Sequence, residues 1–154
     1  MEIISEQAVE RGILRRIRHN SAATGTEMIF ALFTPPGNAK NVPVLFYLSG
    51  LTCNDTNFCT KSGAFSHAAN EGIAIVAPAT SPRGDIPGNG DDWTIGTGAG
   101  FYVDATETPY SKNYKMYTYV TSELPSLLAE KFPSLSTTAH GITGPSAMEK
   151  IQRH

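Results

Sequence analysis

The sequence predicts an α/β fold, in which parallel strands and helices alternate along the chain. A continuously apolar run at Val42–Leu48 is bounded by Ser49 and Gly50, and such a run is typical of a parallel strand covered by helices on both faces. A second short apolar run lies at Ile73–Ala77, and Lys61–Glu71 between the two runs has helical spacing. A strand, a helix and a strand joined by short connections form a βαβ unit.

Two further strand segments precede this unit. Val9–His19 alternates weakly between apolar and charged side chains, and Glu27–Phe33 is a denser β candidate. The turn at Pro35–Asn38 ends the second segment, because its prolines lack amide donors and Gly37 permits a positive φ. Two strands joined near residues 20–25 predict a β-hairpin.

The second half of the chain predicts a long loop, a helix and a short strand. Residues 79–109 are rich in glycine and proline and have no periodicity, and a loop of that length in a compact domain is commonly functional. Asn113–Phe132 predicts a helix, with a kink or boundary near Leu124 because Pro125 lies inside it. Ala139–Thr143 is the strand candidate. The predicted helix at 113–132 is expected to face the core with the apolar residues that recur every three or four positions, which are Tyr117, Val120, Leu124, Leu127 and Leu128.

Composition limits the classes of partner. The 154 residues suit one ordinary domain, and 12 basic against 14 acidic residues give a net charge of −2. No large positive field is available to hold nucleic acid or an anionic membrane, so we expect neither as a partner. The longest apolar run is far shorter than the roughly 20 residues of a membrane span, and the acidic N-terminus is unlike a signal peptide. A cytoplasmic protein is therefore expected.

The cysteine pattern argues against a metal site. Cys53 and Cys59 are the two cysteines of the chain, and their Cys-x5-Cys spacing without a second pair is a poor zinc signature. Two thiols in a cytoplasmic chain are expected to be reduced rather than bridged. The sequence therefore predicts neither a bound metal nor a disulfide scaffold.

Two segments that follow predicted strands carry residues suited to acyl transfer. Gly144-Pro145-Ser146 would place a serine at a sharp strand-to-helix turn, as in the G-x-S-x-G elbow that presents a nucleophile. The second glycine is missing, and a surface turn is the alternative. In Leu48–Cys53, a backbone N–H would lie beside the neighbouring strand end, where an oxyanion is stabilised. The alternative there is a loop that needs Gly50 for its geometry.

Four strings of residues, taken together, are long enough to indicate a particular protein family. They are L-S-G-L-T-C-N-D-x-N-F at 48–58, A-P-A-T-S-P-R-G at 77–84, G-x-G-A-G-F-Y-V-D-A-T at 96–106 and N-Y-K-M-Y-T-Y-V-T-S-E-L-P at 113–125. With them the chain resembles the S-formylglutathione hydrolase family, also called esterase D, from about residue 3 to Gly144. The resemblance implies an α/β-hydrolase fold and hydrolysis of the thioester S-formylglutathione to glutathione and formate, a step in formaldehyde removal. It implies no metal or organic cofactor.

The resemblance also implies roles for individual residues. The family's serine elbow, G-H-S-M-G-G, aligns with 144–149, so Ser146 matches the nucleophile that attacks the thioester carbonyl. The backbone N–H of Leu51 matches one oxyanion donor, and the N–H of Ala147 stands where the second belongs. Cys53 corresponds to a thiol close to the active site that is not itself catalytic.

Departures from the family begin at this elbow. Pro145 stands where the family has histidine, and Met148 and Glu149 replace glycines. The likeness stops after Ser146, whereas members of the family are nearly twice as long and carry the Asp and His of the triad after the serine. We therefore expect residues 1–144 to be the N-terminal part of a single α/β-hydrolase domain. This incomplete fold would lack its C-terminal strands and helices, and 145–154 would form a divergent, disordered tail.

Truncation has two expected consequences. A serine without a base is a weak nucleophile at neutral pH, so little or no hydrolase activity is expected of this chain. Its last strand would also leave an open sheet edge that favours association, including a homo-oligomer. Two alternatives to the family's thioesterase function stay open. One is a non-catalytic fragment that binds a partner through that edge, and the other is a general carboxylesterase acting on simple aryl esters.

Overall fold

The computed structural model describes residues 1–90, 96 and 100–145 of the chain. Its strands form one mixed sheet with the order β1-β2-β3-β5-β4-β6. The strands are β1 (Glu2–Val9), β2 (Gly12–Asn20), β3 (Glu27–Thr34), β4 (Val42–Tyr47), β5 (Ala74–Pro78) and β6 (Leu135–Thr143). The helical segments are α1 (Asp55–Lys61), α2 (Phe65–Glu71), η2 (Tyr110–Lys112), α3 (Met116–Thr118), η3 (Tyr119–Glu123) and α4 (Leu124–Lys131).

Strand pairing confirms the predicted hairpin and the βαβ unit. β2 and β3 pair antiparallel, with Asn20 opposite Glu27 at the turn. β4 lies parallel to both β5 and β6, and β5 joins the hairpin by pairing antiparallel with β3. The sequence did not predict β1, which pairs antiparallel with β2. Every residue of β1 is exposed or half-buried, so its apolar pattern is weak.

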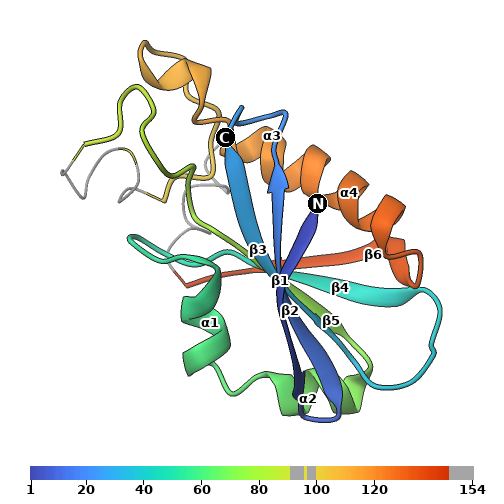
Figure 1. Cartoon of the computed structure of the whole chain (residues 1–154). Helices are drawn as coiled ribbons and strands as arrows, with labels where there is room; N and C mark the ends of the chain where they lie inside the picture. Colours follow the sequence, from blue (N-terminus) through green and yellow to red (C-terminus); the bar gives the residue numbers. More distant parts are fainter. Residues whose placement is uncertain (91–95, 97–99, 146–154) are drawn as a thin grey trace.

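Helices cover both faces of the sheet and enclose two apolar cores (Figure 1). α1 and α2 lie on one side, and the helix formed by α3, η3 and α4 lies on the other. Alternation along β4 explains the continuously apolar run, because Val44 and Phe46 belong to the core under α4. Leu45 and Tyr47 pack against the core under α1 and α2.

The helix predicted at 61–71 is shorter in the structure, where α2 covers Phe65–Glu71. Gly63 has a φ of +61°, which separates α2 from the end of α1 at Lys61. The sequence did not predict α1, which begins at Asp55 because Asn54 and Asn57 form a capping box. Asn54 Oδ1 accepts from the Thr56 N–H at 2.9 Å, and Asn57 Oδ1 accepts from the Asn54 N–H at 2.9 Å.

A π-helical turn changes the predicted face of the long helix. Tyr117 was predicted to face the core but is 52% exposed, whereas Met116 and Tyr119 are buried. The Leu124 N–H donates to Tyr119 O, five residues back, and this wider turn shifts the buried positions around the axis. The predicted boundary near Leu124 is confirmed, because α4 begins there and holds Pro125 in its first turn.

The two edges of the sheet differ in their chemistry. β1 carries Glu2 and Glu6 and is irregular between Ile3 and Ser5, and charges and bulges protect an edge from further pairing. β6 has no Asp, Glu, Lys or Arg in its nine residues. Within the described part of the chain it pairs with β4 alone, so β6 is the open edge predicted from the sequence.

Candidate active site

The candidate site lies at the carboxyl ends of β4 and β6. The Leu48 N–H donates to Thr143 O at 2.8 Å, which holds the end of β6 against the end of β4. A Cβ atom on Gly144 would lie only 2.1 Å from Leu48 O, so this approach requires glycine. The first glycine of the predicted elbow therefore packs on the residue that opens the predicted oxyanion loop. Ser146 and Ala147 lie outside the described residues.

The loop after β4 forms a tight and strained turn, which we name the 49–53 turn. The Cys53 N–H donates to Gly50 O at 3.3 Å and places Leu51 and Thr52 at the centre of the turn. Thr52 has a φ of +65°, which is unusual for a β-branched residue and costs roughly 1–2 kcal/mol. Backbone strain of this kind gathers at functional sites.

Leu51 sits at the surface of this turn and is 39% exposed. In the structure as described its backbone N–H donates to no other group. An N–H that is fixed in a turn and has no partner can bind an oxygen that gains negative charge during a reaction. The geometry of Leu51 is thus compatible with the oxyanion donor expected from the sequence.

Three side chains from distant segments hold the two ends of the 49–53 turn. The Tyr102 hydroxyl donates to Ser49 O at 2.9 Å. Thr80 Oγ1 and Arg83 Nη2 both donate to Cys53 O, each at 2.6 Å. Burial raises the pKa of Tyr102, so its hydroxyl keeps its proton and remains a donor.

An ion pair fixes the helix that follows the turn. Asp55 is the first residue of α1, and its side chain is 3% exposed. Both of its oxygens accept from Arg16 on β2, with distances of 2.6 Å from Nε and 3.1 Å from Nη2. The hydrogen bond to Asp55 raises the pKa of Arg16. This bidentate ion pair attaches α1 to the sheet immediately beyond the 49–53 turn.

The two cysteines occupy different environments. Both are free and half-buried. The structure places Cys53 at the end of the 49–53 turn, whereas Cys59 lies inside α1 and its thiol donates to Asp55 O at 3.4 Å. Burial raises the pKa of Cys59 to about 11, so its thiolate is scarce at neutral pH.

Two of the three described histidines are hydrogen-bonded away from the 49–53 turn, and the third is exposed on α2. His140 Nε2 lies 2.8 Å from Ser136 O, and His67 is exposed on α2. His19 is buried with its Nε2 3.0 Å from the Tyr119 hydroxyl, and burial lowers its pKa. His154 lies outside the described residues. None of the three described imidazoles is therefore placed as a base for a nucleophile beside the turn.

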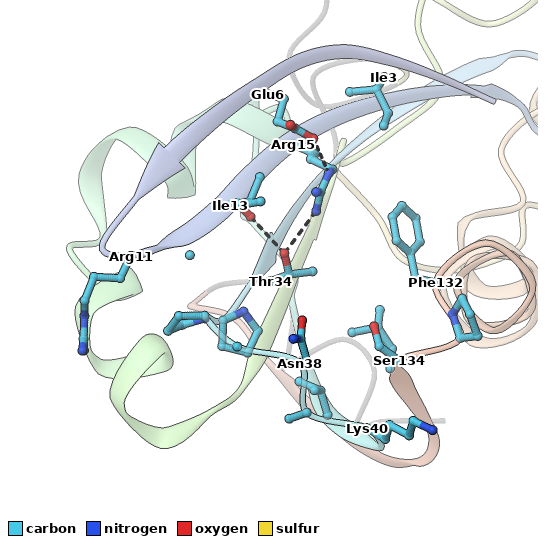
Figure 2. A pocket seen from close by; sticks show the side chains of 18 residues that line it. Ile3, Glu6, Arg11, Ile13, Arg15, Thr34, Asn38, Lys40, Phe132 and Ser134 are labelled. Carbon is cyan, nitrogen blue, oxygen red and sulfur yellow. Dashed lines mark hydrogen bonds and ion pairs between the residues drawn. The ribbon is translucent and has the colours of Figure 1, made fainter.

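A cavity of about 980 Å³ lies at the opposite end of the sheet (Figure 2). Its lining includes Val42 and Leu135, the first residues of β4 and β6. A strand rises about 3.3 Å per residue, so this cavity lies about 20 Å from the 49–53 turn. Inside it Arg15 donates to Glu6 and to Thr34, which pairs its charge within the protein. This cavity is separate from the candidate active site.

A smaller apolar cavity of about 320 Å³ is lined by residues of the segments that follow β5, including Ser81, Phe101 and Val103. Phe101 and Val103 form part of its wall and are 38% and 37% exposed. Gly100 precedes them with a φ of +59°, and a Cβ there would lie 3.5 Å from Gly50 O. The segment that contributes to this cavity therefore runs beside the 49–53 turn.

The described residues contain no group of three or more His, Cys, Asp or Glu side chains that could hold a metal ion. None of the helices that the structure describes has the length and apolar character needed to cross a membrane.

Comparison with known proteins gives consistent matches. Residues 21–147 match a family model described as "Putative esterase". The S-formylglutathione hydrolase of Paracoccus denitrificans is 51% identical over 146 residues, which are 94% of this chain and 52% of that protein. The S-formylglutathione hydrolase of Rattus norvegicus is 42% identical over 151 residues, with 94% and 54% covered. The chain therefore spans about half the length of the curated relatives it matches.

The fold also matches a solved structure closely. The S-formylglutathione hydrolase from Agrobacterium tumefaciens superposes with a TM-score of 0.91 at 42% identity, covering 96% of this chain and 53% of that chain. A ferulic acid esterase at 17% identity and a TM-score of 0.64 shares the fold alone. These matches confirm the predicted hydrolase-type α/β fold over the described residues.

Sequence reasoning missed the residues that hold the 49–53 turn. Thr80 and Arg83 lie in the string at 77–84, and Tyr102 lies in the string at 96–106. Both strings were specific to the family, but no local pattern indicates which backbone carbonyl their side chains reach. A signal was available in the length of the intervening loop, since such loops are commonly functional.

Proposed function

Because the chain belongs to the esterase family, we propose that it supplies one half of the active site of an S-formylglutathione hydrolase. The reaction is hydrolysis of the thioester to glutathione and formate, a step in formaldehyde removal. The observation that carries the proposal is the packing of Gly144 on Leu48 O, which joins the expected elbow to the 49–53 turn. The small-molecule thioester would bind over this turn.

Ser146 is the nucleophile in this proposal. Its oxygen attacks the formyl carbon, the C–S bond breaks, and glutathione leaves as the thiol after taking up a proton. Water then adds to the formyl-enzyme, releases formate and restores the serine. A base must take the serine proton at the first step. His19 and His140 are hydrogen-bonded elsewhere and His67 is exposed on α2, so in this proposal the base and its acidic partner come from outside the described residues.

The Leu51 N–H and the Ala147 N–H stabilise the oxyanion in this proposal. Negative charge develops on the carbonyl oxygen as the serine attacks, and donors that are already oriented need no rearrangement at that moment. Loss of one such donor lowers kcat by roughly 10²–10³-fold in hydrolases. Cys53 lies two residues after Leu51 in the turn and has no part in the proposed chemistry.

We also propose the domain boundaries and the cellular location that the sequence predicts. Residues 1–144 form the N-terminal part of one α/β-hydrolase domain, and 145–154 are a divergent tail that begins at the serine elbow and includes Ser146 and Ala147. A cytoplasmic location agrees with two free cysteines among the described residues.

A chimaera tests the proposed function directly. Residues 1–144 of this chain are joined to the part of the Paracoccus denitrificans relative that begins just after the first glycine of its serine elbow. Hydrolysis of S-formylglutathione is expected, together with its loss when the elbow serine is replaced by alanine. A folded chimaera without this activity would refute the proposal, with the intact relative assayed in parallel as the control.

The 154-residue chain gives the complementary result. Without a base beside Ser146, turnover of S-formylglutathione should fall to the residual level that oxyanion donors and binding alone provide. The assay compares the chain, its Ser146→Ala variant and the chimaera at equal concentrations. Turnover by the chain near that of the chimaera would show that a base lies within these residues.

A second candidate function is association through the β6 edge. It is favoured by the contrast between an uncharged β6 and a β1 edge that carries glutamates. Light scattering should find dimers or larger species at micromolar concentration. Ile142→Lys on β6 should shift them toward monomer, and Ile3→Lys on β1 should not. Both isoleucines are comparably exposed, at 43% and 47%, and a monomer at every concentration would refute this candidate.

A third candidate is a general carboxylesterase. The apolar cavity of about 320 Å³, walled by Phe101 and Val103 just after Gly100, would suit an aryl or alkyl group on the substrate. The chimaera decides between the candidates when S-formylglutathione and a p-nitrophenyl ester are compared. A larger kcat/KM for the thioester supports the first candidate, and a larger kcat/KM for the aryl ester supports this one.

A further inference from the structure

We propose that Thr80, Arg83 and Tyr102 form a clamp that fixes the 49–53 turn, and that Thr80 and Arg83 are positioning residues for the Leu51 N–H. The clamp is defined by its three hydrogen bonds to the carbonyls of Ser49 and Cys53. Its role in catalysis rests on the proposed function of Leu51, whereas its effect on the turn does not.

The bonds to Cys53 O use the full capacity of that carbonyl. A carbonyl oxygen has two lone pairs, and Thr80 and Arg83 each donate to it at 2.6 Å. The Arg83 bond is assisted by charge and is therefore stronger than a neutral one. Thr80 is completely buried, so water does not replace its hydroxyl. This arrangement holds one end of the turn in a single orientation.

Tyr102 acts in the same way at the other end. Its ring is 2% exposed, and its hydroxyl donates to Ser49 O at 2.9 Å. Tyr102 and the pair of donors on Cys53 O come from separate parts of the long 79–109 loop. The loop therefore contacts the turn on both sides of Leu51.

The strain at Thr52 explains why a clamp is needed. A positive φ at a threonine is disfavoured, and its value of +65° persists only where surrounding contacts hold it. The turn's own hydrogen bond, from the Cys53 N–H to Gly50 O, is long at 3.3 Å. Without the clamp Thr52 would relax toward negative φ, and the neighbouring peptide planes, including that of Leu51, would rotate.

Thr80→Val tests the clamp, because valine keeps the shape of threonine and removes the donor. The measurement is amide hydrogen exchange at Cys53 in the ¹⁵N-labelled 154-residue chain. The variant should speed this exchange several-fold, and combined with Arg83→Gln it should do so by roughly tenfold or more. Thr80→Ser keeps the hydroxyl and should restore the slow exchange.

Two comparisons make the result decisive. Thr121→Val removes a hydroxyl that donates to Tyr117 O at 2.8 Å on the outer helix, and it should leave Cys53 exchange unchanged. Val76 in the centre of the sheet reports on global stability. Faster exchange at Cys53 with Val76 unchanged supports the clamp.

Three outcomes overturn it. They are an unchanged Cys53 amide in the double variant, equal exchange in Thr80→Ser and Thr80→Val, and parallel acceleration at Val76 in all clamp variants. If Thr80→Val does not fold, Arg83→Gln at the partly exposed arginine decides alone. The readout needs no activity, so an inactive chimaera refutes the proposed function and leaves the clamp to be judged by exchange.

Discussion

Replacing Asp55 by alanine should destabilise the fold strongly, because the carboxylate joins α1 to the sheet. Asp55 is almost fully buried, and Arg16 donates to both of its oxygens. Breaking a buried ion pair costs about 3–5 kcal/mol when the remaining charge is stranded. The Arg16 side chain is 37% exposed and can regain water, so we expect a smaller loss of about 2–3 kcal/mol.

Thermal unfolding followed by circular dichroism measures this loss. For a domain of this size, about 2–3 kcal/mol corresponds to a fall in Tm of roughly 4–12 °C. The matched control is Glu6→Ala, which removes an exposed partner of Arg15 at 2.7 Å and should cost below about 1 kcal/mol. Equal falls in Tm for the two variants at the same protein concentration would refute the reasoning.

Three other perturbations follow from named contacts. Burial lowers the pKa of His19 below its ordinary value of 6.5 although Glu123 opposes the shift, so the unfolded chain binds more protons below that pH. The urea concentration at the unfolding midpoint should therefore decrease as the pH is lowered from 7 to 5. A His19→Gln variant whose midpoint decreases equally over the same pH range would contradict this. Leu124→Ala, at a fully buried side chain, should lower the free energy of unfolding by roughly 2–5 kcal/mol in urea titrations, and a loss within error of zero would be inconsistent with its burial. Gly144→Ala should speed amide exchange at Leu48, because the new methyl group collides with Leu48 O; unchanged exchange would argue against the close approach.

The sequence predicted those parts of the fold whose signals are local. The continuous apolar run at Val42–Leu48 identified β4, because both of its faces are buried. The predicted helix end at Glu71 is confirmed, because Gly72 follows it with a φ of +67°. β1 was missed because its side chains are not buried in alternation. Tyr117 was misplaced because a π-helical turn cannot be recognised from spacing alone.

The same distinction between local and distant signals explains which parts of the candidate site the sequence predicted. Gly144 and the loop at 48–53 were predicted because a glycine after one strand and a loop after its neighbour follow simple rules for strand ends, whereas the choice of Leu51 within that loop came from the family resemblance. The clamp and the Asp55–Arg16 ion pair were not predicted. The clamp joins residues that are 27 to 53 positions apart, and the ion pair joins residues that are 39 positions apart. Nothing in the local sequence indicates such partners, and only the folded chain brings them together.

The proposed hydrolase function requires Ser146 to lie beside the Leu51 N–H. Paramagnetic relaxation measures this placement directly, with a spin label on Ser146→Cys in a background carrying Cys53→Ser and Cys59→Ser. The amide signals of residues 50–52 should be lost with the oxidised label and return on reduction. Those of 38–41, at the other end of β4, should be unaffected. Intact signals at 50–52 in the oxidised sample would contradict the placement.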